Sequence, residues 1–172
     1  MLEGHAVLLN ADYSPLGVVS MKKAVKLLAK GKAEVVEAST RIIFNAERTV
    51  KFVLPLVLKL IKMIRSIFKR KVPFNKKNVL LRDGYECAYC GKDIRGRASI
   101  DHIIPKSAGG KSCFENVVAC CVPCNNKKDN RLPRQAHMFP KKQAKEPTIM
   151  EFVTIQIRKW GMEDALKKLG VI

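Results

Sequence analysis

Short apolar runs separated by polar turns dominate the first 55 residues, and this pattern predicts a small mixed α/β unit. A helix is expected after the first apolar run, because Ser20 can cap its start and Gly31 suits its C-terminal end. Apolar side chains recur at helical spacing between these two residues. The runs that are typical of strands are residues 6–10, 33–38, 41–44 and 50–55.

The pattern changes from Pro55, where basic residues recur every three or four positions among apolar ones. This spacing predicts an amphipathic helix with one basic stripe, formed by Lys59, Lys62, Arg65 and Lys69. Eleven basic residues and no acidic residue lie between Arg48 and Arg82, which favours contact with phosphates. The alternative is a core-packing helix whose lysines only reach solvent.

Further helices are expected at residues 78–83, 149–159 and 162–169, the last two after a lysine-rich linker that follows Pro140. The composition shifts predict three parts. These are an N-terminal α/β region with the basic helix at residues 1–72, a central module at residues 73–139 and a helical C-terminal tail at residues 140–172.

The charge balance favours a polyanionic partner. The chain has 33 Lys and Arg residues against 15 Asp and Glu, a formal net charge of +18. Nucleic acid is the leading candidate, and the charge by itself leaves open a membrane surface, ribosomal RNA or a basic protein without such a partner. The most apolar stretch, residues 52–68, is interrupted by basic residues and is not expected to span a membrane. The N-terminus shows no signal-peptide pattern, so a cytoplasmic protein is expected.

Two cysteine pairs have the spacing of metal ligands. The segments CAYC and CVPC contain Cys87 and Cys90, and Cys121 and Cys124. Four thiolates predict a tetrahedral structural zinc site, with no open position for water or substrate. Cys120 could compete for the metal, but only Cys121 has the two-residue spacing to Cys124. The thirty residues between the pairs exceed the usual 15 to 20 of a plain zinc ribbon, so the zinc site brackets an insert.

The insert and its flanks contain an ordered set of motifs. SIDHIIP includes Asp101 and His102, a glycine pair and ENVV with Asn116 follow, and CVPCNNKKDNR includes Asn125. Together with the cysteine pairs, these motifs resemble the HNH endonucleases over about residues 79–138. The resemblance implies an α+β chain with a ββα-metal (His-Me finger) HNH core. The segment upstream, from residue 7 to about 37, also resembles the leader region that precedes this module in many bacterial family members.

This resemblance implies a metal-dependent endonuclease that hydrolyses phosphodiester bonds in DNA and leaves 5′-phosphate and 3′-hydroxyl ends. His102 can accept a proton from water near neutral pH, because its ordinary pKa is about 6.5. Adjacent residues of a strand point to opposite faces, so Asp101 is expected to bind Mg²⁺ or Mn²⁺ together with the amide oxygen of Asn125. The resemblance also implies that Asn116 fixes the orientation of the His102 side chain.

Phosphate contacts are expected from basic side chains in and before the module. Lys128 and Arg131 lie three residues apart after Asn125 and would share one helix face, where a solvated face is the alternative. The other expected DNA contacts are Lys69, Arg70, Lys71, Lys76 and Lys77.

Two other functions remain open at this point. A non-catalytic zinc module could bind nucleic acid with the same basic residues, without using the Asp-His-Asn set. An accessory nuclease of restriction or phage DNA packaging could act only with a protein partner, and a homodimer is equally compatible with the sequence. The cofactors expected for the nuclease are Zn²⁺ in the structural site and Mg²⁺ or Mn²⁺ in the catalytic site.

Overall fold

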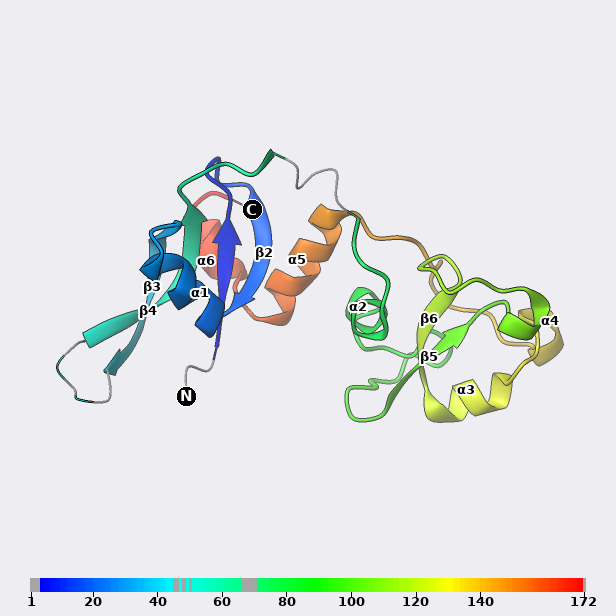
Figure 1. Cartoon of the computed structure of the whole chain (residues 1–172). Helices are drawn as coiled ribbons and strands as arrows, with labels where there is room; N and C mark the ends of the chain where they lie inside the picture. Colours follow the sequence, from blue (N-terminus) through cyan, green and yellow to red (C-terminus); the bar gives the residue numbers. More distant parts are fainter. Residues whose placement is uncertain (1–3, 45–46, 48, 50, 66–70, 172) are drawn as a thin grey trace. The chain divides into compact units, whose positions relative to one another are not determined.

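The computed structural model describes residues 4–44, 47, 49, 51–65 and 71–171, and the chain divides into two units (Figure 1). Unit 1 contains residues 1–70 and 153–172, and unit 2 contains residues 71–152. The predicted tail is therefore divided, because residues 153–172 belong to unit 1. No helix among the described residues is long and apolar enough to cross a membrane.

Unit 1 is built on a four-stranded mixed sheet. Its strand order is β2-β1-β4-β3, in which β1 and β4 are parallel and the other neighbours are antiparallel. The predicted strand at residues 6–10 is confirmed, and the two predicted strands at 33–38 and 41–44 are one long strand. The strands are β1 (His5–Leu9), β2 (Pro15–Ser20), β3 (Ala33–Phe44) and β4 (Lys51–Leu60).

Apolar side chains are buried on both faces of this sheet. The helix α1 (Met21–Ala29), predicted from Ser20 and Gly31, packs its buried Ala24 against strand residues such as Ala6 and Leu8. Val7 and Leu9 alternate with these residues and are also buried, although they point to the opposite face. The helices α5 (Ile149–Lys159) and α6 (Glu163–Lys168) agree with the predicted helices, and α6 contacts β4.

The strand predicted at residues 50–55 is confirmed over 51–55, but the basic helix predicted from Pro55 is wrong as far as residue 65, and its last residues lie outside the described part of the chain. Residues 51–60 form β4, a central strand with β1 and β3 as neighbours. Leu54, Val57 and Leu58 are all buried, so the strand is covered on both faces. Such a strand has a continuous apolar run without a period of two, which sequence periodicity cannot distinguish from a buried helix.

The basic residues assigned to that stripe have other surroundings. Lys59 Nζ lies 2.8 Å from the carboxylate of Glu34, its partner on β3, and above the ring of Tyr13. Lys62 and Arg65 are exposed beyond the strand, and Lys69 lies outside the described residues. Lys59 therefore stabilises a cross-strand pair rather than contributing to a row of phosphate contacts.

Unit 2 contains the predicted order of strand, loop, strand and helix. The strands β5 (Ala98–His102) and β6 (Val117–Cys121) pair antiparallel, with His102 opposite Val117. The helix α3 follows β6 directly and completes a ββα arrangement. It begins at Val122, earlier than the predicted start at Asn125, because Cys121 caps it and Pro123 suits its first turn. The other elements are α2 (Lys76–Arg82), η2 (Lys106–Ala108), α3 (Val122–Lys128) and α4 (Pro133–Ala136).

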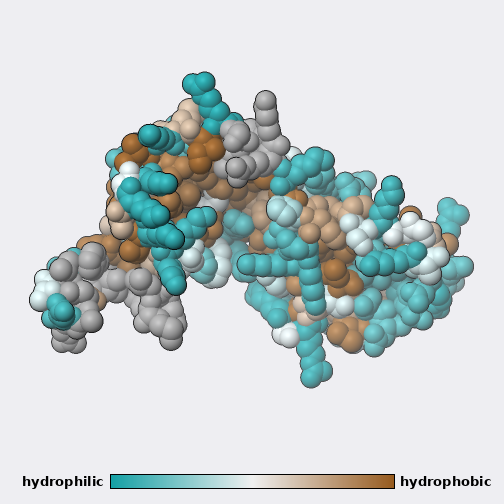
Figure 2. All heavy atoms as spheres, in the orientation of Figure 1, coloured by the Kyte–Doolittle hydropathy of each residue, from teal (hydrophilic) through white to brown (hydrophobic). Residues whose placement is uncertain are grey.

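The end of α2 is bonded to the ββα arrangement. Arg82 donates to the carbonyl oxygens of Phe114 and Val117 at 2.6 and 2.7 Å, and it also pairs with the carboxylate of Asp83. Asp83 in turn accepts from the backbone N–H of Ala119 at 2.7 Å. These bonds attach α2 to β6 and to the loop before it. On the face of unit 2 that Figure 2 shows, hydrophilic residues cover much of the surface.

Candidate active site and metal centre

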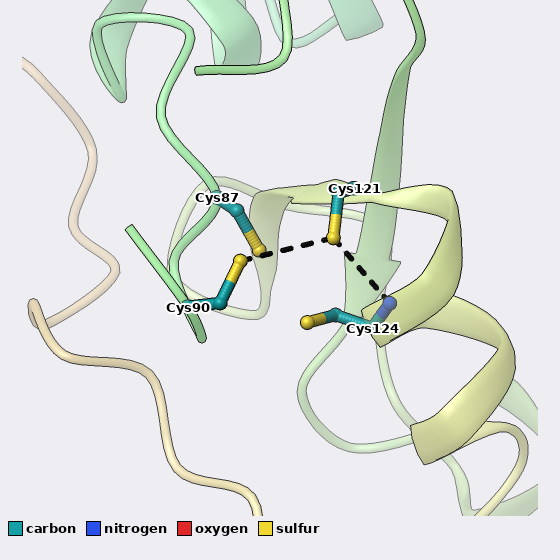
Figure 3. Close-up of side chains that lie close together, drawn as sticks. All are labelled: Cys87, Cys90, Cys121 and Cys124. Atoms are coloured by element: carbon teal, nitrogen blue, oxygen red, sulfur yellow. Dashed lines mark hydrogen bonds between the residues drawn. The ribbon is translucent and has the colours of Figure 1, made fainter. Parts of the chain in front are cut away.

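Four cysteine thiols converge at one end of the ββα arrangement (Figure 3). Cys87 and Cys90 come from the turn before β5, Cys121 ends β6, and Cys124 lies in the first turn of α3. Their Sγ atoms all lie within 4.8 Å of one another, and those of Cys90 and Cys121 are 3.9 Å apart. Zn–S bonds of about 2.3 Å in a tetrahedron require sulfur atoms about 3.8 Å apart, so the cluster fits a zinc ion.

The surroundings of the four thiols differ: burial raises the pKa of Cys121 and Cys124, whereas Cys87 is prepared for metal binding. Burial raises the pKa of Cys87, but backbone N–H groups of Cys90, Cys121 and Tyr89 outweigh it and lower the pKa to about 6. The thiolate is the form that binds a metal, so Cys87 is prepared for zinc near neutral pH. Cys121 Sγ also accepts from the backbone N–H of Cys124 at 3.4 Å, which caps α3.

The choice of Cys121 over Cys120 agrees with the structure. Cys120 is buried outside the cluster and precedes Cys121 on β6, where adjacent side chains point to opposite faces. Burial raises the pKa of Cys120 to about 12, so it stays a thiol. Cys113 is half-buried and also lies outside the cluster.

A cavity of about 320 Å³ lies at the end of β5 and brings three predicted catalytic residues together. Asp101, His102 and Asn125 all line it, with Lys106 and Asp129 among the other lining residues. Asp101 and His102 were expected on opposite faces of the strand. Both residues nevertheless line the cavity, which lies at the end of β5 where His102 is the last residue of the strand.

The Asp101 carboxylate is buried and held through one of its oxygens. Oδ2 accepts from the Tyr89 hydroxyl at 2.5 Å and lies 2.9 Å from Lys128 Nζ. Burial, and then the bond to Asp101, raises the pKa of Tyr89 far above its usual value, so the phenol remains a donor. Both of these contacts are to Oδ2, so Oδ1 is the carboxylate oxygen that a divalent cation could use.

The prediction that Lys128 binds phosphate is wrong. Its side chain is 0% exposed and points to Asp101, and Nζ also donates to the backbone oxygen of His102 at 2.8 Å. A buried ammonium requires such partners, because an unpaired charge in the interior is strongly unfavourable. Sequence spacing could not reveal this inward direction.

Arg131 does not share a helix face with Lys128 either, because α3 ends at Lys128. Its guanidinium donates to the carbonyl oxygens of Lys127 and Lys128, which are among the last of the helix. Lys71, Lys76 and Lys77 are exposed, as DNA contacts require, and Lys71 lies 3.4 Å from Glu146. The remaining expected contacts, Lys69 and Arg70, lie outside the described residues.

His102 is half-buried at the edge of the cavity. Its Nε2 lies 2.9 Å from the Ser112 hydroxyl. Burial, followed by the positive charge of Lys106, lowers the pKa of His102 below its usual 6.5. The imidazole is therefore neutral at physiological pH, which is the form that accepts a proton.

Asn116 acts on the loop after His102. Its Oδ1 accepts from the backbone N–H of Ile104 at 2.9 Å, and its Nδ2 donates to the carbonyl oxygens of Ile104 and Lys111. The ring of His102 is bonded by Ser112 instead. Gly110 permits this arrangement, because a Cβ there would lie 1.7 Å from the carbonyl oxygen of Ile104.

Asn125 projects from α3 into the same cavity. Its Nδ2 donates to the Ser99 hydroxyl at 2.9 Å, and this bond orients the amide. The amide oxygen is then the atom left for a ligand. Carboxylate and amide oxygens are suitable donors for Mg²⁺ or Mn²⁺, so Asp101 and Asn125 fit such an ion.

Three residues of this site were missed by the sequence analysis: Tyr89, Lys106 and Ser112. Tyr89 lies inside the CAYC segment, whose spacing indicates a role only for the two cysteines. Ser112 is ten residues from His102 and reaches it only because the loop folds back. No local spacing in the sequence signals these contacts.

Comparison with known proteins gives two family matches and one similar protein. Residues 87–140 match the family described as HNH endonuclease, and residues 6–66 match the family described as HNH endonuclease-associated, N-terminal domain. The CRISPR-associated endonuclease Cas9 of Corynebacterium diphtheriae is 41% identical over 51 residues. This segment is 28% of the chain and only 5% of that relative. No solved structure matches the chain.

Replacing a zinc ligand should destroy the metal centre. Cys121→Ser is expected to lower the zinc content below one ion per chain and to unfold unit 2, because three ligands and a weakened helix cap remain. Elemental analysis and circular dichroism measure the two effects. Cys120→Ser is the matched control and should retain one zinc per chain. Loss of zinc in that variant, or its retention in Cys121→Ser, would contradict the ligand assignment.

Adding a methyl group at Gly110 should displace the loop that Asn116 holds. Gly110→Ala is expected to lower the free energy of unfolding by about 1–3 kcal/mol, because the new Cβ overlaps the Ile104 carbonyl. Urea unfolding of the zinc-loaded protein measures this change. Gly96→Ala is the control, since a Cβ at that position meets no atom within 4 Å. Equal stability of the two variants would refute the steric argument.

Proposed function

We propose, on the basis of the two HNH endonuclease family matches, that the chain is a metal-dependent endonuclease that hydrolyses phosphodiester bonds in DNA. The products are 5′-phosphate and 3′-hydroxyl ends. The observation that carries this proposal is the cavity in which a neutral histidine lies together with a carboxylate and an amide. Hydrolysis of a phosphodiester requires a base for water and a cation for the phosphate, and these residues can supply both.

His102 is the general base in this proposal. When its Nε2–H donates to the Ser112 hydroxyl, the lone pair of Nδ1 is available to a water molecule. The protein then accepts the proton of the attacking water at Nδ1. Asn116 contributes indirectly, because it fixes the backbone of the loop that contains Ser112 and follows His102.

Asp101 and Asn125 would hold the divalent ion through Oδ1 of the carboxylate and the amide oxygen. Such an ion supplies positive charge to the phosphate and the leaving oxygen. Two protein ligands are sufficient, because Mg²⁺ keeps several waters and binds phosphate oxygens. The four cysteines would have a separate, structural task, since four thiolates would leave a bound zinc ion no free coordination position.

DNA is supported as the substrate by the charge of the chain and by exposed basic residues. The net charge is +18, and Lys71, Lys76 and Lys77 of unit 2 are exposed. Lys106 is exposed at the cavity itself, where it can approach a phosphate. These contacts are electrostatic, so binding should weaken as salt increases.

Replacing the base should abolish cleavage without unfolding the protein. His102→Ala is expected to lower the rate of plasmid cleavage with Mg²⁺ or Mn²⁺ by about 10²–10⁴-fold, because the water loses its proton acceptor. Gel electrophoresis measures the rate, and sequencing identifies the ends. The control is His137→Asn, which replaces an exposed histidine outside the cavity and should retain activity.

The outcomes also separate the alternative functions. If the unaltered protein binds DNA tightly but leaves plasmid intact, it is a nucleic-acid-binding module. If cleavage requires a second protein, it is a partner-dependent nuclease.

The pH dependence of cleavage should follow the neutral form of His102. Single-turnover rates are expected to rise with pH and to reach a plateau, with a midpoint below 6.5 because the pKa of His102 is lowered. Lys106→Gln removes a positive charge that lowers this pKa and should move the midpoint upward. A midpoint above 6.5, or one unaffected by Lys106→Gln, would contradict this assignment.

A further inference from the structure

Tyr89 connects the zinc-binding turn to the cavity. It lies between Cys87 and Cys90, and its ring packs on the buried cluster that includes Leu80 and Ala119. Its hydroxyl crosses to the Asp101 carboxylate at 2.5 Å. This distance is typical of a charge-assisted bond from a hydroxyl to a carboxylate.

The segment that contains Tyr89 is firmly held. Cys87 and Cys90 belong to the four-thiol cluster, and the backbone N–H of Ala88 donates to the Ala119 oxygen of β6 at 2.8 Å. A second backbone bond, from Gly91 N–H to the Cys87 oxygen, closes the turn. The position of the Tyr89 hydroxyl is therefore determined by the zinc-binding turn rather than by a free loop.

Lys128 holds the same carboxylate oxygen from α3. Its Nζ lies 2.9 Å from Asp101 Oδ2 and also donates to the backbone oxygen of His102. Two donors from different elements thus converge on Oδ2. A carboxylate held through one oxygen has its other oxygen in a defined direction.

We propose that Tyr89 is a positioning residue that, with Lys128, directs Oδ1 of Asp101 toward the divalent ion. This inference rests on the proposed function, because it concerns the same metal site. Groups that hydrogen-bond to metal ligands orient them, and their loss commonly weakens metal affinity by 10-fold to 100-fold. The Tyr89 hydroxyl donates to Asp101 Oδ2, and replacing Tyr89 by Phe removes this bond while the ring stays in place.

The test is a titration of the zinc-loaded full chain with Mn²⁺ in the absence of DNA, in which electron paramagnetic resonance measures the binding. Tyr89→Phe is expected to retain one zinc per chain and the unaltered circular dichroism spectrum, and to weaken Mn²⁺ binding about 10-fold. Cleavage should then require about 10-fold more Mn²⁺ for half-maximal rate. At saturating Mn²⁺ the rate should approach that of the unaltered protein, which a general loss of structure would not produce.

Two further variants make the result specific. Asp101→Asn identifies the Mn²⁺ that binds in the cavity, because it removes the carboxylate ligand. Tyr85→Phe is the matched control, since Tyr85 packs on the same buried cluster as Tyr89. It should leave Mn²⁺ affinity unchanged.

The outcomes separate this inference from the proposed function. If Tyr89→Phe binds Mn²⁺ as tightly as the unaltered protein, the positioning role is refuted while the nuclease proposal stands. If Tyr89→Phe loses zinc or unfolds, its role is structural and the inference is also refuted. If the unaltered protein binds no Mn²⁺ and cleaves no DNA, both proposals fail together.

Discussion

The convergence of four cysteine thiols is the constraint on which unit 2 depends. It joins the turn before β5, the end of β6 and the start of α3 at one point. The two-stranded sheet is too small to bury a large core, so a metal-bound cluster can supply stability that apolar packing cannot. Because Cys121 also caps α3, the same group sets the position at which the helix begins.

The start of α3 in turn positions the candidate active site. Asn125 and Lys128 lie one and four residues after Cys124, and both reach β5, to Ser99 and to Asp101 respectively. The cavity is thus assembled from a helix and a strand that the thiols hold together. A structural metal can therefore control catalytic geometry without contacting substrate.

The site also contains opposite charges in close contact. The Asp101–Lys128 pair is buried, and such a pair is seldom a net source of stability, because both charges lose their hydration. In the proposed site its role is geometric, since it would restrict the direction of a carboxylate that could otherwise rotate. Lys106 gives a second example: its charge at the cavity favours the neutral form of His102 and can attract a phosphate.

The sequence by itself determined the features that depend on neighbouring residues. The two-residue cysteine spacing predicted the metal cluster, and the order of motifs predicted strand, loop, strand and helix. The strand predicted at residues 50–55 is part of β4, but only the tertiary structure decided that it continues to Leu60 instead of giving way to a helix, because burial on both faces removes the periodicity that marks a strand. It also decided the contacts of Tyr89, Ser112 and Lys128, which join residues 10 to 27 positions apart through the folding of β5, its loop and α3. A side chain's direction into a cavity follows from such packing, and no local pattern of residues contains it.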